Sequence, residues 1–417
     1  VRNIIFSVDG SEYRWGPTLD WYQIGVQLGR MMEKARYYDQ EGEFDAAASI
    51  ASEVILFVGK HYSDDRVYEC ESYDGYDFET ESATDMLISL IEAKVLDFGI
   101  IKRIFSDIDK AAGTSTFSDG MYCVADLSEL QSVLRGVFDD FDEHLASLDK
   151  RIDNAGRAVH YKNRWLFRKV AYLNYKEKYD VAQEIIDDNF FVPELSKMRI
   201  DSQVFRGQIE EAIESLDRAI VCTKDSSYVY KCHKRKQELL NSIGDTSRQA
   251  EELEYLILNS YSSVYDYYFQ LKYILGQLSV NSSNRLHSII EELLGKNCFH
   301  LQKDIARICV EEHMIPQLAE CLSWSNDYNN ECYKILAEYG ELLDSSTKRK
   351  IVEGNIDNIR TRAIPTNSRV YGYVVSKMEA LRDSCDEGRT AVNELIVEFR
   401  TRYSRRTSLM RELDKLC

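Results

Sequence analysis

The sequence predicts an all-α fold, namely an α-solenoid of tetratricopeptide-like helical hairpins. The 417 residues include only four prolines, and proline is the residue that most strongly interrupts helices. Residues 205–220 read as a helix end, a turn at Gly207 and a second helix with one apolar face, formed by Ile209, Ala212, Ile213, Leu216, Ala219 and Ile220. Similar segments recur along the chain, which is typical of a helical repeat protein.

The recurring segment has a glycine, an apolar residue two positions later and an alanine five positions later. Residues 207–212 and residues 42–47 both match it. Residues 178–182 keep the interval from aromatic residue to alanine without the glycine, and residues 244–250 keep the glycine but shift the alanine by one position. Small alanines allow a neighbouring helix to approach closely. The predicted structural repeat positions are Gly42, Ala47, Ala182, Gly207, Ala212, Ala219 and Gly244.

Four segments are expected along the chain. Residues 1–16 form a short hairpin around Asp9-Gly10, a favourable turn pair, or are the edge of an upstream domain. Residues 17–160 form an acidic N-terminal helical repeat region. Residues 161–280 form the tetratricopeptide-like repeats, and residues 281–417 form a C-terminal helical region that is mildly basic at its end.

The N-terminal region begins with a helical hairpin whose second helix is predicted over Phe44–Val58. The acidic residues 64–81 lack the ligand alternation and closing glutamate of a calcium-binding EF-hand loop. We therefore expect a solvated loop there, followed by a helix that begins near Ser82 or Thr84. Two more helical stretches are predicted, Met86–Ile104 and Leu127–Leu148.

The remaining residues read as consecutive helical elements. Three hairpins of about 34 residues each are predicted first, over Trp165–Asn189, Pro193–Cys222 and Tyr228–Leu258. Further helices follow with a weaker repeat pattern, over Leu286–Leu294, Leu301–His313, a segment starting at Pro316, Cys332–Leu343, Lys348–Arg362, Arg369–Leu381 and Ala391–Tyr403.

The charge distribution limits the classes of partner. The net charge is −18 overall. Residues 1–160 carry −16, residues 161–344 carry −7, and residues 345–417 carry +5. An acidic body opposes binding of duplex nucleic acid, because neutralisation of phosphates supplies most of that affinity. Only the C-terminal part is suited to an anionic partner.

Cysteine usage and hydropathy point to a cytoplasmic protein. The ten cysteines are scattered singly, without a tandem CxxC pair, so we expect reduced thiols. No apolar run approaches the roughly 20 residues of a membrane span, and no signal peptide is visible. The first residue, Val1, is not an initiator methionine, so we expect a fragment or a processed product.

No pattern typical of an enzyme or a bound cofactor occurs. The sequence contains no GxSxG, HExxH, phosphate-binding loop or dinucleotide fingerprint. Carboxylate pairs such as Glu210-Glu211 are plentiful, but they fall where exposed helix faces are normally charged. We therefore expect a non-enzymatic protein without a cofactor.

One group of side chains has the chemistry of a zinc site, formed by Cys298, His300, Cys309 and His313. Cys309 and His313 are four residues apart and would share a helix face. Cys309 also lies on the apolar stripe of its helix, where single cysteines are mostly buried hydrophobic residues. We favour this second interpretation and expect no bound metal. The pair Cys232-His233 has no second pair near it in sequence.

Tyrosines cluster around residues 261–273. Their simplest role is packing between repeats. Alternatively, Tyr261, Tyr265 and Tyr268 line a face that binds a peptide, since tyrosine offers a large contact area at low entropic cost.

Gly244-Asp245 opens a helix that ends Glu254-Tyr-Leu-Ile-Leu258 and is followed by Asp266-Tyr-Tyr-Phe-Gln-Leu-Lys272. The close of the chain carries Val392-Asn-Glu-Leu-Ile396 and Tyr403-Ser-Arg-Arg406, and the N-terminal hairpin has Gly42-Glu-Phe-Asp-Ala-Ala47 and an acidic loop that ends near Asp85. In these segments most of the chain resembles the C-terminal helical region of bacterial SWIM zinc-finger proteins. The resemblance implies a non-enzymatic helical scaffold, beside DNA-remodelling or ATPase partners. The CxC…CxH zinc motif that names the family is absent from these residues, and Thr407 replaces a proline common in the family.

Two functions follow from these observations. The first is a scaffold that mediates protein–protein interaction. The second is an accessory nucleic-acid-binding subunit that acts through Arg402, Arg405 and Arg406 or through an upstream SWIM zinc finger. Because these arginines are three and four residues apart, we expect them on one side of a helix that continues past Tyr403. We favour their pairing with carboxylates of neighbouring repeats as a polar cap over binding of phosphate.

Overall fold

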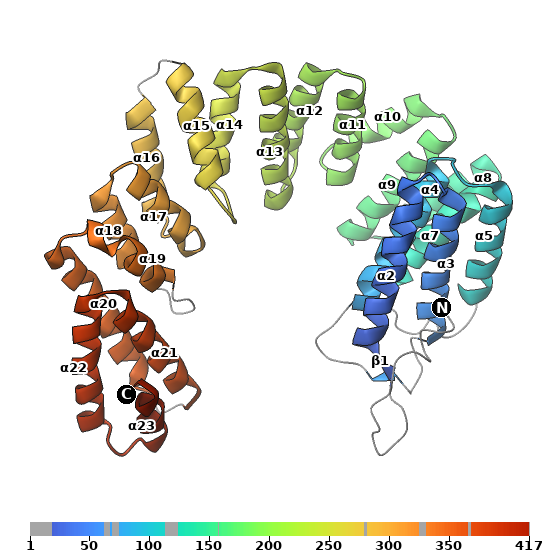
Figure 1. Ribbon diagram of the computed structural model, residues 1–417. Helices are drawn as coiled ribbons and strands as arrows, with labels where there is room; N and C mark the ends of the chain where they lie inside the picture. Colours follow the sequence, from blue (N-terminus) through green and yellow to red (C-terminus); the bar gives the residue numbers. More distant parts are fainter. Residues whose placement is uncertain are drawn as a thin grey trace. The chain divides into compact units, whose positions relative to one another are not determined.

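The protein is all-α, as the sequence predicts (Figure 1). The computed structural model describes residues 19–61, 67–68, 75–112, 124–156, 158–278, 282–324, 331–365 and 368–416. These contain twenty-one α-helices, three short 3-10 helices and two strands of two residues each. Strand β1 (Leu19–Asp20) pairs in parallel with β2 (Val67–Tyr68). The hairpin predicted within residues 1–16 lies outside the described residues.

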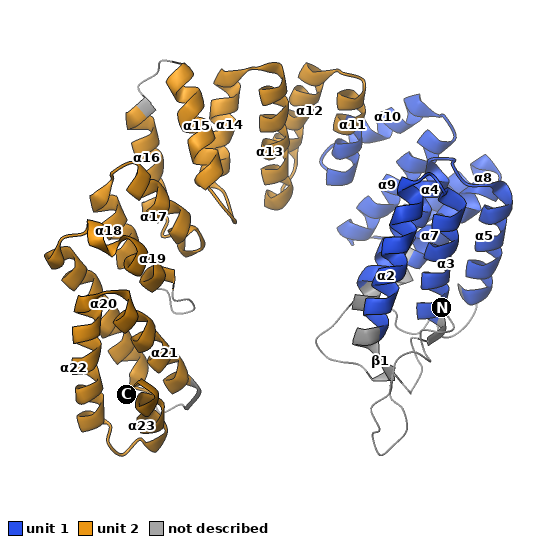
Figure 2. Ribbon diagram, viewed as in Figure 1, with its two compact units in different colours: residues 1–199 blue, residues 200–417 orange. Residues whose placement is uncertain are grey.

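The chain divides into two compact units, residues 1–199 and residues 200–417 (Figure 2). The helices of the first unit are α2 (Trp21–Gln40), α3 (Phe44–His61), α4 (Gly75–Glu92), α5 (Phe98–Ala112), α7 (Val124–Phe138), α8 (Phe141–Asn154), α9 (Val159–Tyr175) and α10 (Tyr179–Asp188). Helices α2, α3 and α4 pack against one another, and α7 contacts both α4 and α5. Helix α8 packs on α9, which in turn contacts α10. Apolar residues of α2 to α7 form one continuous core.

Three expectations for the first unit are wrong at their boundaries. Helix α4 begins at Gly75, so the end of the acidic stretch is helical rather than a loop leading to Ser82 or Thr84. The stretch Met86–Ile104 is two helices, because Lys94 adopts a left-handed conformation (φ 57°) that ends α4. Leu127–Leu148 is also two helices. The Asp140 carboxylate accepts hydrogen bonds from the backbone N–H groups of residues 142 and 143 and thereby starts α8.

The second unit is a regular series of helical pairs. Helix α11 (Pro193–Phe205) contains the division between the units, and the helices that follow are α12 (Ile209–Cys222), α13 (Ser226–Ile243), α14 (Thr246–Leu258), α15 (Tyr265–Gln277), α16 (Ser282–Gly295), α17 (Gln302–Glu311), α18 (Ile315–Ser323), α19 (Glu331–Tyr339), α20 (Ser345–Ala363), α21 (Ser368–Ser384), α22 (Asp386–Arg402) and α23 (Thr407–Leu413). From α14 to α22 most helices contact both the next helix and the one after it. This is the packing of an α-solenoid. The hairpins predicted over residues 193–258 are confirmed, and Pro316 lies in the first turn of α18 as expected.

The predicted repeat glycines occupy the turns between paired helices. Gly42, Gly207 and Gly244 have φ angles of 77°, 74° and 75°, the left-handed region that favours glycine. The next backbone N–H closes each turn, as in the 2.9 Å hydrogen bond from Gln208 to the Gln203 carbonyl. All four predicted repeat alanines are buried, at 0% or 1% exposure: Ala47, Ala182, Ala212 and Ala219.

Other turns use the same geometry without glycine. Glu177 and His313 have φ angles of 62° and 57°, and each is followed by the same type of closing hydrogen bond, 2.8 Å long in both cases. The glycine pattern does not mark these two turns, but the hairpin predicted over Trp165–Asn189 contains the first, and the helix predicted to end at His313 stops at the second. The turn at Glu177 explains why residues 178–182 continue the repeat without a glycine.

Candidate functional site

Buried charge in the first unit is concentrated where α4, α7, α8 and α9 meet. The side chain of Glu129 on α7 is 3% exposed and accepts hydrogen bonds from Arg164 and Arg168, which lie four residues apart on α9. Arg168 also contacts Glu92 of α4 at 3.2 Å. Burial raises the pKa of Glu92, and Arg168 opposes that rise. Two carboxylates and two guanidinium groups thus balance one another and join three helices.

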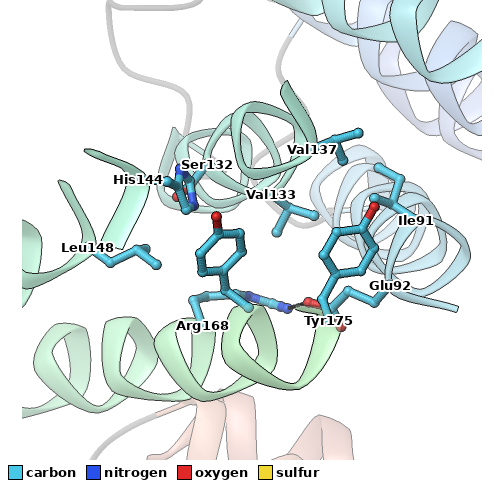
Figure 3. A pocket seen from close by; sticks show the side chains of 10 residues that line it. Ile91, Glu92, Ser132, Val133, Val137, His144, Leu148, Arg168 and Tyr175 are labelled. Carbon is cyan, nitrogen blue, oxygen red and sulfur yellow. Dashed lines mark hydrogen bonds and ion pairs between the residues drawn. The ribbon is translucent and has the colours of Figure 1, made fainter. Parts of the chain in front are cut away.

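A small pocket opens beside this ion-pair network (Figure 3). Its lining includes Arg168 and Glu92 together with Ser132, His144 and Tyr172. The His144 ring is buried against Tyr172, with ring centroids 4.4 Å apart, and its Nδ1 lies 3.6 Å from Asp139. Burial lowers the pKa of His144, and Asp139 opposes that shift. Burial raises the pKa of Tyr172 to about 12.

The pocket offers room for a water molecule rather than for a substrate. Its cavity volume is about 20 Å³, and about 10–15 Å³ is needed to hold one water. The Tyr172 hydroxyl has no hydrogen-bond partner among the described residues, which suits a bound water. The charged groups already pair with one another. We therefore interpret this cluster as structural.

Of the candidate zinc ligands, Cys309 lies on α17, whereas Cys298, His300 and His313 lie in the segments that flank this helix. Cys309 is fully buried in the apolar core, and burial raises the pKa of its thiol to about 12. His313 is exposed in the left-handed turn after α17, while His300 hydrogen-bonds to the Ser260 carbonyl at 3.3 Å. Cys298 is half-buried. Among the described residues no group of three or more His, Cys, Asp or Glu side chains is arranged to hold a metal ion.

The three tyrosines predicted to bind a partner have different environments. Tyr268 is 1% exposed and belongs to the core of the second unit, so it is unavailable to a partner. Tyr265 is covered by the Arg307 guanidinium, 3.7 Å from its ring centroid, and its hydroxyl donates to Glu311. Tyr261 is 74% exposed in the segment between α14 and α15. Only Tyr261 presents most of its side chain to solvent.

Tyr261 belongs to a surface that the sequence did not reveal. We call it the tyrosine patch, and it comprises Tyr230, Tyr255, Tyr261 and Tyr267. The rings of Tyr230 on α13 and Tyr261 meet edge to face, with centroids 6.4 Å apart. Burial, and next the neighbouring Tyr230, raise the pKa of Tyr267 on α15. Burial and the nearby Tyr261 raise the pKa of Tyr255 on α14. Except for Tyr261, the patch tyrosines are half-buried.

Ion pairs between neighbouring helices support the tyrosine patch. The His233 ring stacks on Tyr255, with centroids 3.5 Å apart, and its Nδ1 lies 2.6 Å from the Glu252 carboxylate. Lys236 contacts both Glu252 (2.8 Å) and Asp217 (2.6 Å). Burial favours a raised pKa for Glu252, but the hydrogen bonds from His233 and Lys236 outweigh it and the pKa is lowered. This network joins α12, α13 and α14 and contacts Tyr255 through the His233 ring.

The C-terminal arginines do not form one helical stripe. Helix α22 ends at Arg402 rather than continuing past Tyr403, so the expectation of a shared side is wrong. Arg402 lies 3.8 Å from Glu398 of its own helix. Arg406 stacks on Tyr403 and donates to the Ala363 carbonyl at 2.8 Å. Arg405 is exposed. Arg406 therefore joins neighbouring repeats as the cap interpretation expects, but through a carbonyl instead of a carboxylate.

Comparison with known proteins adds little to this description. No protein-family model and no curated protein sequence matches the chain. Among solved structures, it aligns with a "circular tandem repeat protein with novel repeat topology and enhanced subunit contact surfaces". The identity is 13%, the alignment covers 93% of this chain and 90% of that chain, and the TM-score is 0.13. A TM-score this low supports no functional argument. The assignment as a helical repeat rests on the packing of the helices.

The described helices also bear on membrane insertion. None of them combines the length and the apolar character that a membrane span requires.

Proposed function

We propose that this chain is a non-enzymatic helical-repeat scaffold that binds a protein partner through the tyrosine patch. The observation that supports the proposal most directly is the edge-to-face contact of an exposed tyrosine, Tyr261, with the half-buried Tyr230 of α13. The half-buried Tyr255 of α14 and Tyr267 of α15 lie near this pair. Interface hot spots are enriched in tyrosine, because its ring buries much area while its hydroxyl still makes hydrogen bonds.

Rigidity of the patch supports the same role. Three of the four patch tyrosines are carried by the consecutive helices α13, α14 and α15, and Tyr261 lies in the short segment between α14 and α15. The contacts of Glu252 fix α14 to α13. A pre-organised surface loses little conformational entropy when a partner binds. We place the protein in the cytoplasm as part of the proposal, because all seven cysteines in the described residues are free thiols.

Site-specific photo-crosslinking tests the proposal in cells that naturally express the protein. Tyr261 is replaced by p-benzoylphenylalanine in one variant, and Tyr273, which is 69% exposed on α15 but makes no aromatic contact with the patch, is replaced in the control. We expect a discrete protein adduct at position 261 that is weak or absent at position 273. Equal adducts at both positions, or none at 261, would contradict the proposal.

Nucleic-acid binding through the C-terminal arginines is the alternative. Arg406 already donates to a backbone carbonyl, which leaves Arg402 and Arg405 for phosphate. Replacing these two with alanine would then lower the salt slope of duplex binding by roughly two units. The resemblance to SWIM zinc-finger proteins is likewise a proposal, and the tyrosine patch does not depend on it.

A further inference from the structure

The exposed side of α13 adds positive charge to the tyrosine patch. Lys234 lies four residues after Tyr230 on this helix, so the two side chains project from the same side. Lys231 is adjacent to Tyr230 in sequence, and both lysines are exposed. Among the described residues, neither lysine has a carboxylate within ion-pair distance, although the chain carries an excess of acidic residues.

The other cations around the patch have carboxylate partners. Lys236 contacts Asp217 and Glu252, and Arg235 lies 3.2 Å from Glu238. Arg248 at the start of α14 pairs with Glu210 at 2.9 Å. Within the described residues, Lys231 and Lys234 are thus positive charges next to Tyr230 that lack the ion pairs of these neighbouring cations. A partner that supplied carboxylates at that edge would complete the pairing seen for the neighbouring cations.

We propose that the tyrosine patch, together with Lys231 and Lys234, binds an acidic peptide segment. This inference rests on the proposed function and names its partner. An aromatic or aliphatic side chain of the peptide packs on Tyr261 and Tyr230, where apolar contact with tyrosine rings is available. Asp or Glu residues next to that anchor pair with the two lysines. Exposed ion pairs of this kind add specificity and association rate more than affinity.

A peptide fits the charge distribution better than a nucleic-acid strand does. Acidic side chains also border the patch: Glu238 on α13 pairs with Arg235, and Asp266 is adjacent to Tyr267 in sequence on α15. The outer face of the adjacent helix α12 is also acidic, with Glu210, Glu211 and Glu214 exposed. A nucleic-acid backbone carries a negative charge on every nucleotide, so some of its phosphates would lie close to these carboxylates and be repelled. A peptide can confine its acidic residues to one end.

The test is selection of a random 12-residue peptide library on the full 417-residue chain. We expect the enriched peptides to combine an aromatic or aliphatic anchor with an excess of Asp and Glu on one side of it. Replacing those acidic residues with Asn and Gln in a synthetic peptide should weaken binding about tenfold, the scale of two exposed ion pairs. The double variant Lys231→Glu/Lys234→Glu should lose the acidic peptide and select basic ones instead. Lys303→Glu, at an exposed position on α17, is the control. It should change neither the binding of the acidic peptide nor the kind of peptide selected.

The outcomes separate this inference from the proposed function. If the selected peptides lose binding in Tyr261→Ala/Tyr267→Ala but show no acidic preference, the patch is a peptide-binding surface and the acidic partner is wrong. If the library yields no peptide that depends on these tyrosines, both proposals fail. Patch-dependent binding of an oligo(dT) probe in place of peptides would assign the surface to nucleic acid and overturn the inference.

Discussion

The guanidinium Nη1 of Arg406 donates a 2.8 Å hydrogen bond to the carbonyl of Ala363, 43 residues earlier in the chain. Ala363 is the last residue of α20, and the final carbonyls of a helix have no partner within the helix. A cation at this end also complements the helix dipole. Arg406 therefore connects the turn between α22 and α23 to the end of α20.

Arg406→Ala should destabilise the C-terminal repeats by about 1–3 kcal/mol, because it leaves a helix-terminal carbonyl unpaired. Hydrogen exchange of α20 and α23 measures the effect as faster exchange. Arg405→Ala removes the same charge from an exposed neighbour and should stay within about 0.5 kcal/mol. Equal effects of the two substitutions would show that charge, rather than the hydrogen bond, is what matters here.

Ala212→Arg tests the hairpin packing. Ala212 is 0% exposed, so a large cation there overpacks the interface between helices and buries an unpaired charge. We expect a loss of about 3 kcal/mol or more in urea denaturation. Glu211→Arg places the same side chain on the exposed face of α12 and should be nearly neutral. An unchanged unfolding midpoint for Ala212→Arg is incompatible with the assigned repeat.

Two glycine substitutions should have opposite signs. Gly207→Ala forces an L-residue into a left-handed turn and should cost about 1 kcal/mol. Gly354 lies in the middle of α20, and a Cβ added there meets no atom within 4 Å. Gly354→Ala should therefore stabilise the second unit by about 0.5–1 kcal/mol. Urea denaturation of the two variants provides the comparison, and a stabilising Gly207→Ala would contradict the turn geometry.

The first unit should lose stability in mild acid because of His144. Burial lowers the pKa of His144 in the folded state below its usual value of 6.5. The unfolded chain therefore binds the proton more readily, and stability falls as pH drops below about 6.5 until the folded pKa is passed. Urea denaturation at a series of pH values measures this slope. His144→Gln should reduce it, whereas His160→Gln, at an exposed position on α9, should leave it unchanged.

Cysteine reactivity should follow burial and not depend on metal. Burial raises the pKa of Cys309 to about 12 and that of Cys332 to about 11, whereas Cys222 is exposed. In the native protein, iodoacetamide should modify Cys222 well before Cys309, because the thiolate is the reactive form. A chelator should not change this order. Faster labelling of Cys309 after chelation, read by mass spectrometry, would instead indicate a zinc site that includes this residue.

Much of the architecture was predictable because it depends on local sequence. The helical spacing of apolar residues and the scarcity of proline predict the helices, and the hairpins between residues 193 and 258 follow from the repeated glycine and alanine positions. The helix boundaries that the sequence predicted wrongly depend on single residues. Lys94 adopts a conformation that glycine normally occupies, and the capping by Asp140 interrupts an otherwise continuous apolar pattern.

The candidate site was only partly visible in the sequence. Tyr261 and Tyr268 were both predicted contact residues, but Tyr261 is exposed and Tyr268, on the next helix, is buried. Side chains from one helix point in directions fixed by its rotation, so neighbouring tyrosines in sequence face different surroundings. The pairing of Glu129 with Arg164 and Arg168 had one local signal, two arginines four residues apart on α9, which did not identify their partner.

The sequence alone determined that this chain is a series of helical hairpins, since helix formation and turn formation are governed by residues within a few positions of one another. Only the tertiary structure decided which side chains share a surface. Tyr230, Tyr255 and Tyr267 come from three different helices and lie near one another because the helices stack in order. The contact of Arg406 with Ala363 arises in the same way. Such contacts depend on the rotation and stacking of whole helices, which no local pattern specifies.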